Sequence, residues 1–380
     1  MTHVIAGGGI AGLAAGLALA RAGREVRLYE QEAEFSEFGA GLQLGPNGVK
    51  ALQALGAWEA VRPGCYAPEA IHIRDGLSGK SLKKLSLARF PQLFGAPYRV
   101  IHRADLLAGL LEMARREPHI HLETGRRITG FSSQAVHFAE GPDEPYRLLI
   151  GADGIGSIIR RKLLADGPAP YAGQMIARAL IPAKRLPQVA ADVHLWLYPG
   201  GHVVAYPVSS GRNINLVAAF DSPQTAEGWQ SELPRQTLLN LFAHACSELL
   251  SWLQAPESWR QWPGAERPAA QIWGRGPVSL IGDAAHPTLP YLAQGAVMAL
   301  EDAVSLGRLL PQAHDLAEGL RKYEANRQPR TAAIVKASSK LARIYHARGP
   351  IRLARNSVIK AMPTSVALSR MGFLYDWTPP

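Results

Sequence analysis

The N-terminal segment contains the feature that most restricts how this 380-residue chain can fold. Residues 3–6 form a short apolar run that predicts a strand, and the sequence GGGIAG follows directly at residues 7–12. An alanine- and leucine-rich helix to about residue 22 and a second strand at residues 25–30 complete the unit, which ends on Glu30. A strand, a G-x-G-x-x-G turn, a helix and an acid about 20 residues further on are typical of a dinucleotide-binding α/β fold.

The residues of this unit have distinct expected roles. Gly7 allows the tight turn, Gly9 lets a pyrophosphate approach the backbone, and Gly12 allows helix and sheet to pack closely. Glu30 is expected to accept hydrogen bonds from a ribose. A glycine-rich turn without a ligand is the alternative, and the completeness of the unit argues against it.

A second strand–loop–helix unit lies near residue 282. The apolar run 278–281 predicts a buried strand, Asp283 follows it, and a loop with two prolines leads to Gly295, which opens a helix. A helix N-terminus has unpaired N–H groups and a partial positive charge, so it can hold an anion or an electron-rich ring edge. The carboxylate of Asp283 can accept hydrogen bonds from a polyol. Taken alone, the stretch also fits an ordinary structural unit.

Other positions give weaker signals. Three glycines within residues 38–47, Gly41 among them, indicate backbone in close contact with another group. Arg103 opens a predicted helix that ends near residue 116, where it can meet phosphate or flavin or simply be solvated. Asp153 and Gly154 follow a short predicted strand, and Asp-Gly at such a place is a turn by default.

The middle of the chain has a different pattern. From residue 171 to about 220 short strands alternate with turns, without intervening helices, and residues 47–60 and 229–254 predict helices. The fold class expected is therefore α/β, with a Rossmann-like domain, an inserted β-sheet substrate domain and a C-terminal helical segment. The predicted division assigns 1–70, 98–170 and 265–316 to the dinucleotide domain, 71–97 and 171–264 to the substrate domain, and 317–380 to the helical region.

Composition and charge narrow the function. The net charge of +10 favours anionic partners, but no nucleic-acid-binding motif is present, so nucleic acid is not expected. Neither a signal peptide nor a transmembrane run is visible, and two distant cysteines in no metal-ligand spacing indicate free thiols in the cytoplasm. No metal site is expected from the scattered histidines. A basic amphipathic segment at residues 340–355 either contacts membranes or packs as a solvated helix.

Three motifs together resemble one enzyme family. GGGIAG at 7–12, GADGIGSIIR at 151–160 and GDAAHPTLPYLAQGA at 282–296 occur in the order found in the group A flavoprotein monooxygenases, the FAD-dependent aromatic hydroxylases related to salicylate and hydroxybenzoate hydroxylases. The sequences EDA at 301–303 and YEANRQPR at 323–330 are also similar to that family. The resemblance covers nearly the whole chain.

The resemblance implies FAD as cofactor and NAD(P)H as a transient co-substrate. It implies that the adenine half of FAD lies on the glycine turn and Glu30, beside the strand around Ile128, and that Arg103 and Asp283 contact the flavin nucleotide. Backbone at the start of the helix after residue 294 would face the flavin pyrimidine edge. The implied cofactor-binding residues are Gly7, Gly9, Ile10, Ala11, Gly12, Glu30, Gly41, Arg103, Ile128, Asp153, Gly154, Asp283, Gly295, Ala296 and Val297.

The implied reaction is hydroxylation of a small phenolic or heteroaromatic compound, with or without an acid group, by O₂ and a flavin C4a-hydroperoxide. Activation of the ring hydroxyl requires a base or strong acceptor. The candidates are Tyr206 and His202, on one face of a predicted strand, together with Gln43 and Tyr291. Some relatives have histidine at the last two positions, so proton transfer here is expected through Tyr206, His202 or water, unless the substrate needs less activation.

Two alternative functions are compatible with the same fold. The same chemistry can act on another substrate class, by epoxidation, urate-type hydroxylation or hydroxylation of a quinone precursor. A flavin-binding protein without turnover is a further alternative. The expected assembly is a monomer or a homodimer.

Overall fold

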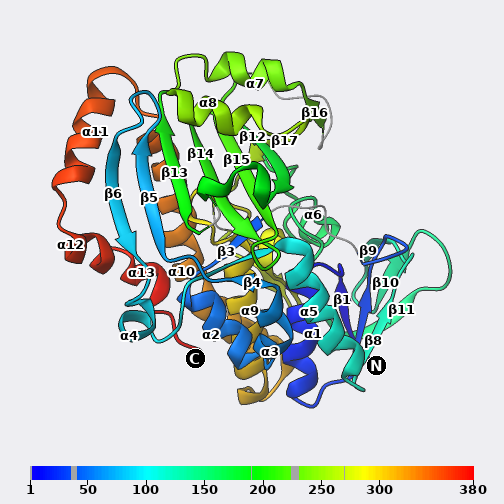
Figure 1. Cartoon of the computed structure of the whole chain (residues 1–380). Helices are drawn as coiled ribbons and strands as arrows, with labels where there is room; N and C mark the ends of the chain where they lie inside the picture. The colour runs from blue at the N-terminus through cyan, green and yellow to red at the C-terminus, as the bar shows by residue number, and fades with distance from the viewer. Residues whose placement is uncertain (1, 36–40, 190, 224–230, 269) are drawn as a thin grey trace.

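A central parallel sheet forms around the N-terminal strand in the computed structural model, which describes residues 2–35, 41–189, 191–223, 231–268 and 270–380 (Figure 1). β1 (Thr2–Ala6) pairs in parallel with a strand on each side, and its apolar residues are buried, as expected for a strand covered on both faces. In spatial order this sheet contains β18 (Gly274–Arg275), β19 (Val278–Leu280), β11 (Glu144–Gly151), β1, β2 (Val26–Tyr29) and β8 (Ile120–Glu123), with β9 (Ile128–Phe131) and β10 (Ala135–Phe138) attached through β11.

Helices pack on this sheet and form the larger core. α1 (Ile10–Arg21) follows the glycine turn and lies between α5 (Arg103–Arg116) and α9 (Gly295–Leu309). The predicted bounds of α5 agree with the structure. The predicted helix 47–60 divides at Gly56, whose φ of +67° is left-handed. The smaller helices of this half are α2 (Pro46–Ala54), α3 (Trp58–Val61), α4 (Phe90–Phe94) and α6 (Ile158–Leu164), with the 3₁₀ turns η1 (Arg62–Gly64), η4 (Gly282–Ala284), η5 (Pro290–Leu292) and η6 (Leu310–Gln312).

A second, mainly antiparallel sheet lies above the first in Figure 1. Helices α7 (Arg235–Leu241) and α8 (Ser247–Gln254) cover its outer face and form a separate core with it. Its strands, in spatial order, are β16 (Ser231–Leu233), β17 (Trp259–Ala265), β12 (Tyr171–Pro182), β15 (Asn213–Asp221), β14 (Gly201–Val208), β13 (Val193–Tyr198), β5 (Ala70–Asp75) and β6 (Ser81–Ser86). The turns η2 (Ala183–Arg185) and η3 (Pro187–Val189) join β12 to β13, and β3 (Gly41–Leu44), β7 (Arg99–His102) and β4 (Cys65–Tyr66) form a small third sheet.

The predicted helix 229–254 is helical over residues 235–241 and 247–254, but the prediction is wrong at residues 231–233 and 242–246. Residues 231–233 form β16, which gains backbone hydrogen bonds by pairing with β17, and residues 242–246 separate α7 from α8. The first two residues of that prediction lie outside the described ranges, as do residues 38–40 of the glycine-rich stretch. The domain division stays a prediction, and the structure shows that β5 and β6 belong to the second sheet although they lie far from its other strands in sequence.

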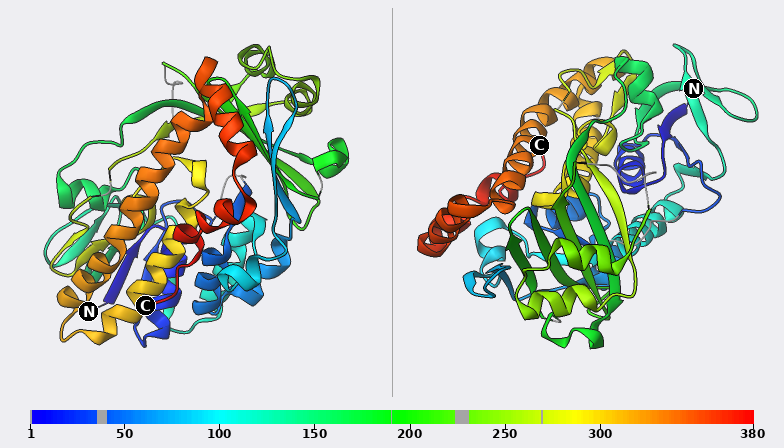
Figure 2. Two further views of the ribbon diagram at one scale, coloured as in Figure 1. Left: turned by 90° about the vertical axis from the view of Figure 1, so that its left-hand side faces the viewer. Right: turned by 90° about the horizontal axis from the view of Figure 1, so that it is seen from above.

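The long helix α10 (Leu316–Tyr345) extends from the first sheet to the second (orange in Figure 2). α11 (Gly349–Ala361), α12 (Thr364–Ser369) and α13 (Gly372–Tyr375) follow it, and α11 lies against β6. Arginines of this basic segment bind within the protein: Arg352 pairs with Asp75, and Arg355 donates to the carbonyls of Ile344 and Tyr345. None of the helices formed by the described residues is both long and apolar enough to cross a membrane.

Candidate active site

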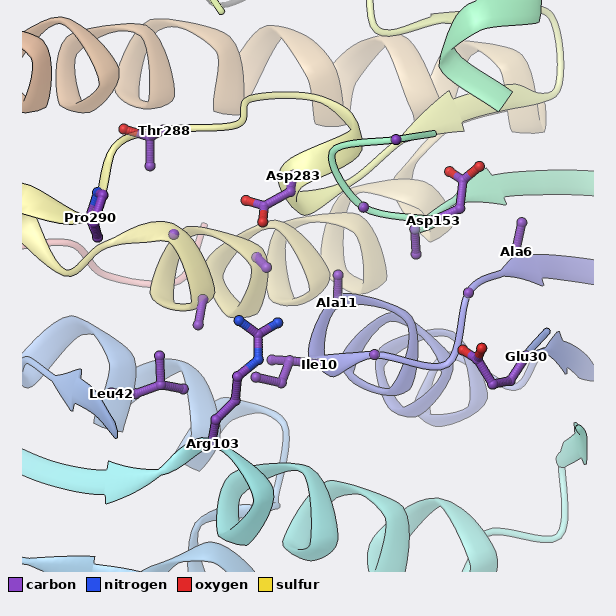
Figure 3. A pocket seen from close by; sticks show the side chains of 18 of the residues that line it. Ala6, Ile10, Ala11, Glu30, Leu42, Arg103, Asp153, Asp283, Thr288 and Pro290 are labelled. Carbon is purple, nitrogen blue, oxygen red and sulfur yellow. The ribbon is translucent and has the colours of Figure 1, made fainter. Parts of the chain in front are cut away.

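A cavity of about 800 Å³ runs between the two large sheets, a size suited to a large ligand (Figure 3). Glu30 lies at one end and Leu42 and Pro290 lie at the other, with Arg103 pointing into the space between them. Most of the predicted site residues line it: Gly7, Gly9, Ile10, Ala11, Glu30, Gly41, Gln43, Arg103, Ile128, Asp153, Gly154, His202, Tyr206, Asp283, Gly295 and Ala296. Gly12, Tyr291 and Val297 do not.

The glycine turn at the end of β1 is shaped by two close approaches. Gly7 has a φ of +105°, and a Cβ there would lie 2.6 Å from the carbonyl oxygen of Ala152. A Cβ on Gly12 would lie only 1.9 Å from the carbonyl oxygen of Gly7. Gly12 therefore stays outside the cavity but permits the turn that borders it.

Glu30 holds the loop at its end of the cavity. One carboxylate oxygen accepts a hydrogen bond from the N–H of Gly8 at 2.7 Å, and the other accepts from the N–H of Glu32 at 3.0 Å. Arg126, Arg127 and Arg161 line the same cavity. The sequence analysis did not identify these arginines, whose positive charges favour an anionic ligand.

Asp153 and Asp283 line the cavity in different ways. Asp153 accepts from Ser157 Oγ at 2.5 Å and from the N–H groups of Ile158 and Ile159 at 2.7 and 3.2 Å, so it holds the start of α6. Burial raises the pKa of Asp153 in spite of these bonds. Asp283 is exposed to the cavity, and a Cβ on Gly295 would lie 3.8 Å from its Oδ1. Asp283 thus faces the N-terminus of α9, whose Gly295 and Ala296 line the cavity where a ligand can meet them.

A buried ion network fixes the loop before α9. His286 Nε2 lies 2.5 Å from Oδ2 of Asp302, and Arg327 Nε donates to Oδ1 of Asp302 at 2.7 Å. Arg327 also pairs with Glu301 at 2.7 Å. Although burial lowers the pKa of Arg327, these two carboxylates raise it above its usual value. The EDA and YEANRQPR sequences therefore meet in space, where they anchor the loop that borders the cavity.

Alternate residues of the second sheet form the opposite end of the cavity. His202, Val204 and Tyr206 point inward from β14, as the period of two predicts. Gly41 leaves space for the ring of Tyr206, because a Cβ at position 41 would lie 2.6 Å from Cε2 of Tyr206. Burial raises the pKa of Tyr206, although Arg178 and Gln43 lower it in part, so the phenol remains protonated at neutral pH.

Two of the remaining candidates bond to other side chains. Gln43 lines the cavity and accepts a hydrogen bond from the hydroxyl of Tyr98 at 2.5 Å. Tyr291 donates to Oε1 of Gln174 at 2.5 Å and packs against the ring of His202 with centroids 4.9 Å apart. Tyr291 thus lies behind His202. Val297 is buried in the first full turn of α9.

Arg178 is a cavity residue that the sequence analysis missed. It comes from β12, its guanidinium lies 5.6 Å from the ring centroid of Trp262, and its Nε is buried without a hydrogen-bond partner among the described residues. Burial lowers its pKa, as does Arg103, while Tyr206 raises it. An arginine within the apolar run MIARALI was the available signal.

Comparisons with known proteins agree with this geometry. The FAD binding domain family matches residues 1–338. The chain is 38% identical over 386 residues to a 3-hydroxybenzoate 6-hydroxylase of Klebsiella oxytoca, covering 99% of this chain and 97% of that protein. It is 36% identical over 350 residues to a 3-amino-4-hydroxybenzoate 2-monooxygenase of Streptomyces cremeus, covering 90% and 87%.

A solved structure shows the same fold. HpxO of Klebsiella pneumoniae, complexed with FAD and uric acid, matches with a TM-score of 0.87 at 27% identity, covering 98% of this chain and 95% of that one. The glycine turn, Glu30 and the N-terminus of α9, which lines the cavity, fit a bound FAD. The predicted α/β fold, the FAD cofactor and the class of NAD(P)H-dependent monooxygenase are confirmed. The chain belongs to the FAD binding domain family, among the FAD-dependent aromatic hydroxylases.

Proposed function

We propose that this enzyme hydroxylates a small aromatic acid with a ring hydroxyl, a compound of the hydroxybenzoate class, using NAD(P)H and O₂. The observation that carries the proposal is Arg178, a half-buried cation in the cavity wall whose buried Nε has no hydrogen-bond partner among the described residues. Buried polar groups normally have hydrogen-bond partners, and a guanidinium matches a carboxylate in shape and charge. The similar hydroxybenzoate and aminohydroxybenzoate enzymes support the same substrate class.

The cofactor end of the cavity supports an extended FAD. We assign its nucleotide half to the glycine turn, Glu30 and the neighbouring arginines, and its flavin half to Arg103, Asp283 and the N-terminus of α9. Bound FAD supplies hydride acceptance from NAD(P)H and, when reduced, the activation of O₂. The partial positive charge at the start of α9 favours the anionic reduced flavin by about 0.3–2 kcal/mol.

The substrate end supports three separate tasks. Arg178 binds and orients the carboxylate, and the protonated hydroxyl of Tyr206 donates a hydrogen bond to the ring oxygen. Burial, together with His346, lowers the pKa of His202 well below its usual value, so its imidazole is neutral and can accept the proton of the ring hydroxyl. Removal of that proton makes the ring electron-rich, which is what oxygen insertion requires.

The test is turnover of the FAD-loaded protein with a panel of ring compounds. NADH and NADPH oxidation would be followed with 2-, 3- and 4-hydroxybenzoate, amino-substituted hydroxybenzoates, phenol and benzoate. The products would be identified by mass spectrometry. We expect a hydroxybenzoate to stimulate oxidation and to gain one oxygen atom, with phenol and benzoate poor substrates. Equal turnover of phenol would contradict the assigned carboxylate site.

A second candidate substrate is a urate-type N-heterocycle. The fold match to HpxO, whose structure contains uric acid, favours including it. Uric acid in the same panel separates the two candidates, because it has no carboxylate for Arg178 to bind, and 6-hydroxynicotinate shows whether a carboxylate on an N-heterocycle is accepted. Incorporation of oxygen into uric acid alone would replace the hydroxybenzoate assignment.

A further inference from the structure

Two further ionisable side chains connect His202 with the protein surface. Nδ1 of His202 lies 3.0 Å from Nε2 of His346, and Nδ1 of His346 lies 2.6 Å from Oδ1 of Asp221. The histidines are 4% and 6% exposed, whereas the Asp221 side chain is 39% exposed. The three side chains therefore form a continuous series of hydrogen bonds from the cavity wall to solvent.

The charge of Asp221 fixes the direction of these hydrogen bonds. Burial raises the pKa of Asp221, but hydrogen bonds from His346 and Arg348 outweigh burial and lower it, so its carboxylate is ionised and can only accept. Nδ1 of His346 must donate to it, which leaves Nε2 of His346 to accept the Nδ1–H of His202. His202 then has its lone pair on Nε2, the nitrogen without a hydrogen-bond partner among the described residues.

The tyrosines packed against the two histidines stay neutral. The rings of Tyr291 and Tyr345 lie 4.9 and 5.2 Å from that of His202, and burial raises the pKa of both, to about 12 for Tyr345. Glu266 and Tyr171 also raise the pKa of Tyr291, as does Asp221. On the cavity side, Tyr206 and Arg178 line the same space as His202. Within the described residues, Asp221 is the carboxylate that hydrogen-bonds to the histidine pair.

Backbone contacts hold the series in place. The N–H of Gly200 donates to the carbonyl oxygen of His346 at 2.9 Å, and the carbonyl oxygen of Gly200 accepts from the N–H of Asp221 at 2.9 Å. A Cβ on Gly200 would lie 2.0 Å from Nη2 of Arg348, which pairs with Asp221 at 3.1 Å. A side chain at position 200 would displace Arg348. The turn before β14 and the end of α10 are thus fitted to each other around these residues.

We propose that His346 and Asp221 carry the substrate's phenolic proton from His202 to solvent, with His346 as a relay and positioning residue behind the catalytic base. The proposal rests on the proposed function, because it needs a ring hydroxyl in the cavity. In the first transfer the substrate O–H bond breaks and an Nε2–H bond forms on His202. In the second the Nδ1–H bond of His202 breaks and an Nε2–H bond forms on His346. The positive charge then lies on His346 beside the Asp221 carboxylate, and the Nδ1 proton leaves through Asp221 to water.

The first test measures the tautomers and does not depend on turnover. Nitrogen-15 histidine NMR of the FAD-loaded protein, assigned with His202→Gln and His346→Gln, reports which ring nitrogen carries the proton. We expect both histidines to be protonated on Nδ1 near neutral pH. Protonation of either resting ring on Nε2 alone would overturn the relay, whatever the substrate is.

The second test separates proton transfer from simple support. In His346→Gln the amide oxygen can still accept the Nδ1–H of His202, but the side chain cannot take up and pass on a proton. We expect its hydroxylation rate to fall by about 10²-fold at neutral pH, with little change in KM, and to recover as pH approaches the pKa of the substrate phenol near about 10. Unchanged rates and an unchanged pH profile would overturn the proposal.

Matched variants complete the test. His72→Gln breaks another imidazole–carboxylate contact, 2.8 Å from Asp192 and outside the cavity, and should keep the wild-type pH profile. Asp221→Asn retains a hydrogen-bond acceptor for His346 but removes the negative charge, so it should shift the pH profile of hydroxylation in the same direction as His346→Gln does. It therefore tests the relay even if His346→Gln fails to fold. If the wild-type enzyme hydroxylates no compound that carries a ring hydroxyl, the proposed function fails. The NMR experiment still decides how the hydrogen bonds of the two histidines are arranged.

Discussion

Arg178 illustrates how one side chain can define the chemistry of a cavity. It projects from β12 between residues that bury their side chains against α7 and α8 on the other face. A charged group in such a wall is costly unless it is paired, so its position favours an anionic partner that arrives with the ligand. The sequence showed an arginine in a strand, but which face of the strand meets the cavity depends on how the sheets pack.

Arg178→Met should therefore weaken binding of aromatic acids selectively. A hydrogen bond to a charged group contributes about 1.5–3 kcal/mol, so KM for a hydroxybenzoate should rise by about 10- to 100-fold. Steady-state kinetics would measure this rise beside the KM for an uncharged phenol, which should hardly change. Arg185→Met removes an arginine that is 44% exposed and serves as control. An equal rise for both ligands would point to general damage to the cavity.

At the scale of elements, the glycine turn and the loop before α9 differ in how much of them the sequence could predict. The turn is local, so its strand, helix and glycines follow from a short stretch of sequence. The loop depends on Asp302 and Arg327, which are 25 residues apart in sequence and meet only because α10 packs against α9. The edge strand β16 was missed for a similar reason, since its partner β17 comes about 28 residues later.

Gly12 and Gly16 provide a matched pair within α1. An added Cβ at position 12 would lie 1.9 Å from a backbone oxygen, whereas one at position 16 would lie 3.6 Å from a methyl group of Ile120. Gly12→Ala should cost about 1–3 kcal/mol through overpacking and lower FAD affinity by about 10- to 100-fold. Gly16→Ala should retain flavin. Flavin fluorescence titration of both variants measures the difference, and similar affinities would contradict the assigned role of the turn.

At the scale of the whole molecule, α10 and α11 connect the two sheets from the outside. α10 contacts β18 and β19 of the first sheet, and its C-terminal end meets the turn before β14 of the second. α11 then returns to β5, where Arg352 and Asn356 bond to the buried Asp75. The sequence predicted helices here, but it could not place Asp75 as the partner of Arg352 and Asn356, because these residues lie 277 and 281 positions away from it in sequence.

The contact at Asp75 should make the docking of α11 sensitive to acid. Burial raises the pKa of Asp75, but hydrogen bonds from Arg352, Ser78 and Asn356 outweigh it and lower the pKa to about 2. A carboxylate with a lowered folded-state pKa stabilises the fold above its unfolded pKa, near about 3.9, and loses that contribution as pH falls toward about 2. The protection of α11 against hydrogen exchange, corrected for the intrinsic exchange rate at each pH, should therefore decrease over this interval.

Asp75→Asn should lose the stabilising contribution of this carboxylate already at neutral pH. We expect a decrease of about 1.5–3 kcal/mol in the free energy of unfolding, measured with urea at pH 7, and less dependence on pH below about 4. Asp143→Asn changes a carboxylate that is 54% exposed and should alter stability little. Wild-type exchange rates in α11 of the Asp75 variant would contradict the docking role.

The placement of the cavity between two separately cored sheets has a consequence for how such an enzyme can change over evolutionary time. Arg178, Val204, Val217 and Ala219 line the end of the cavity that we propose binds the ring, from strands whose other face packs on α7 and α8, whereas the glycine turn belongs to the first sheet. Substitutions at these four positions can alter which ring is accepted while leaving both cores and the nucleotide end intact. We therefore expect substrate preference and cofactor retention to be separable traits in this chain, so that a lineage can acquire a new substrate without first losing its flavin.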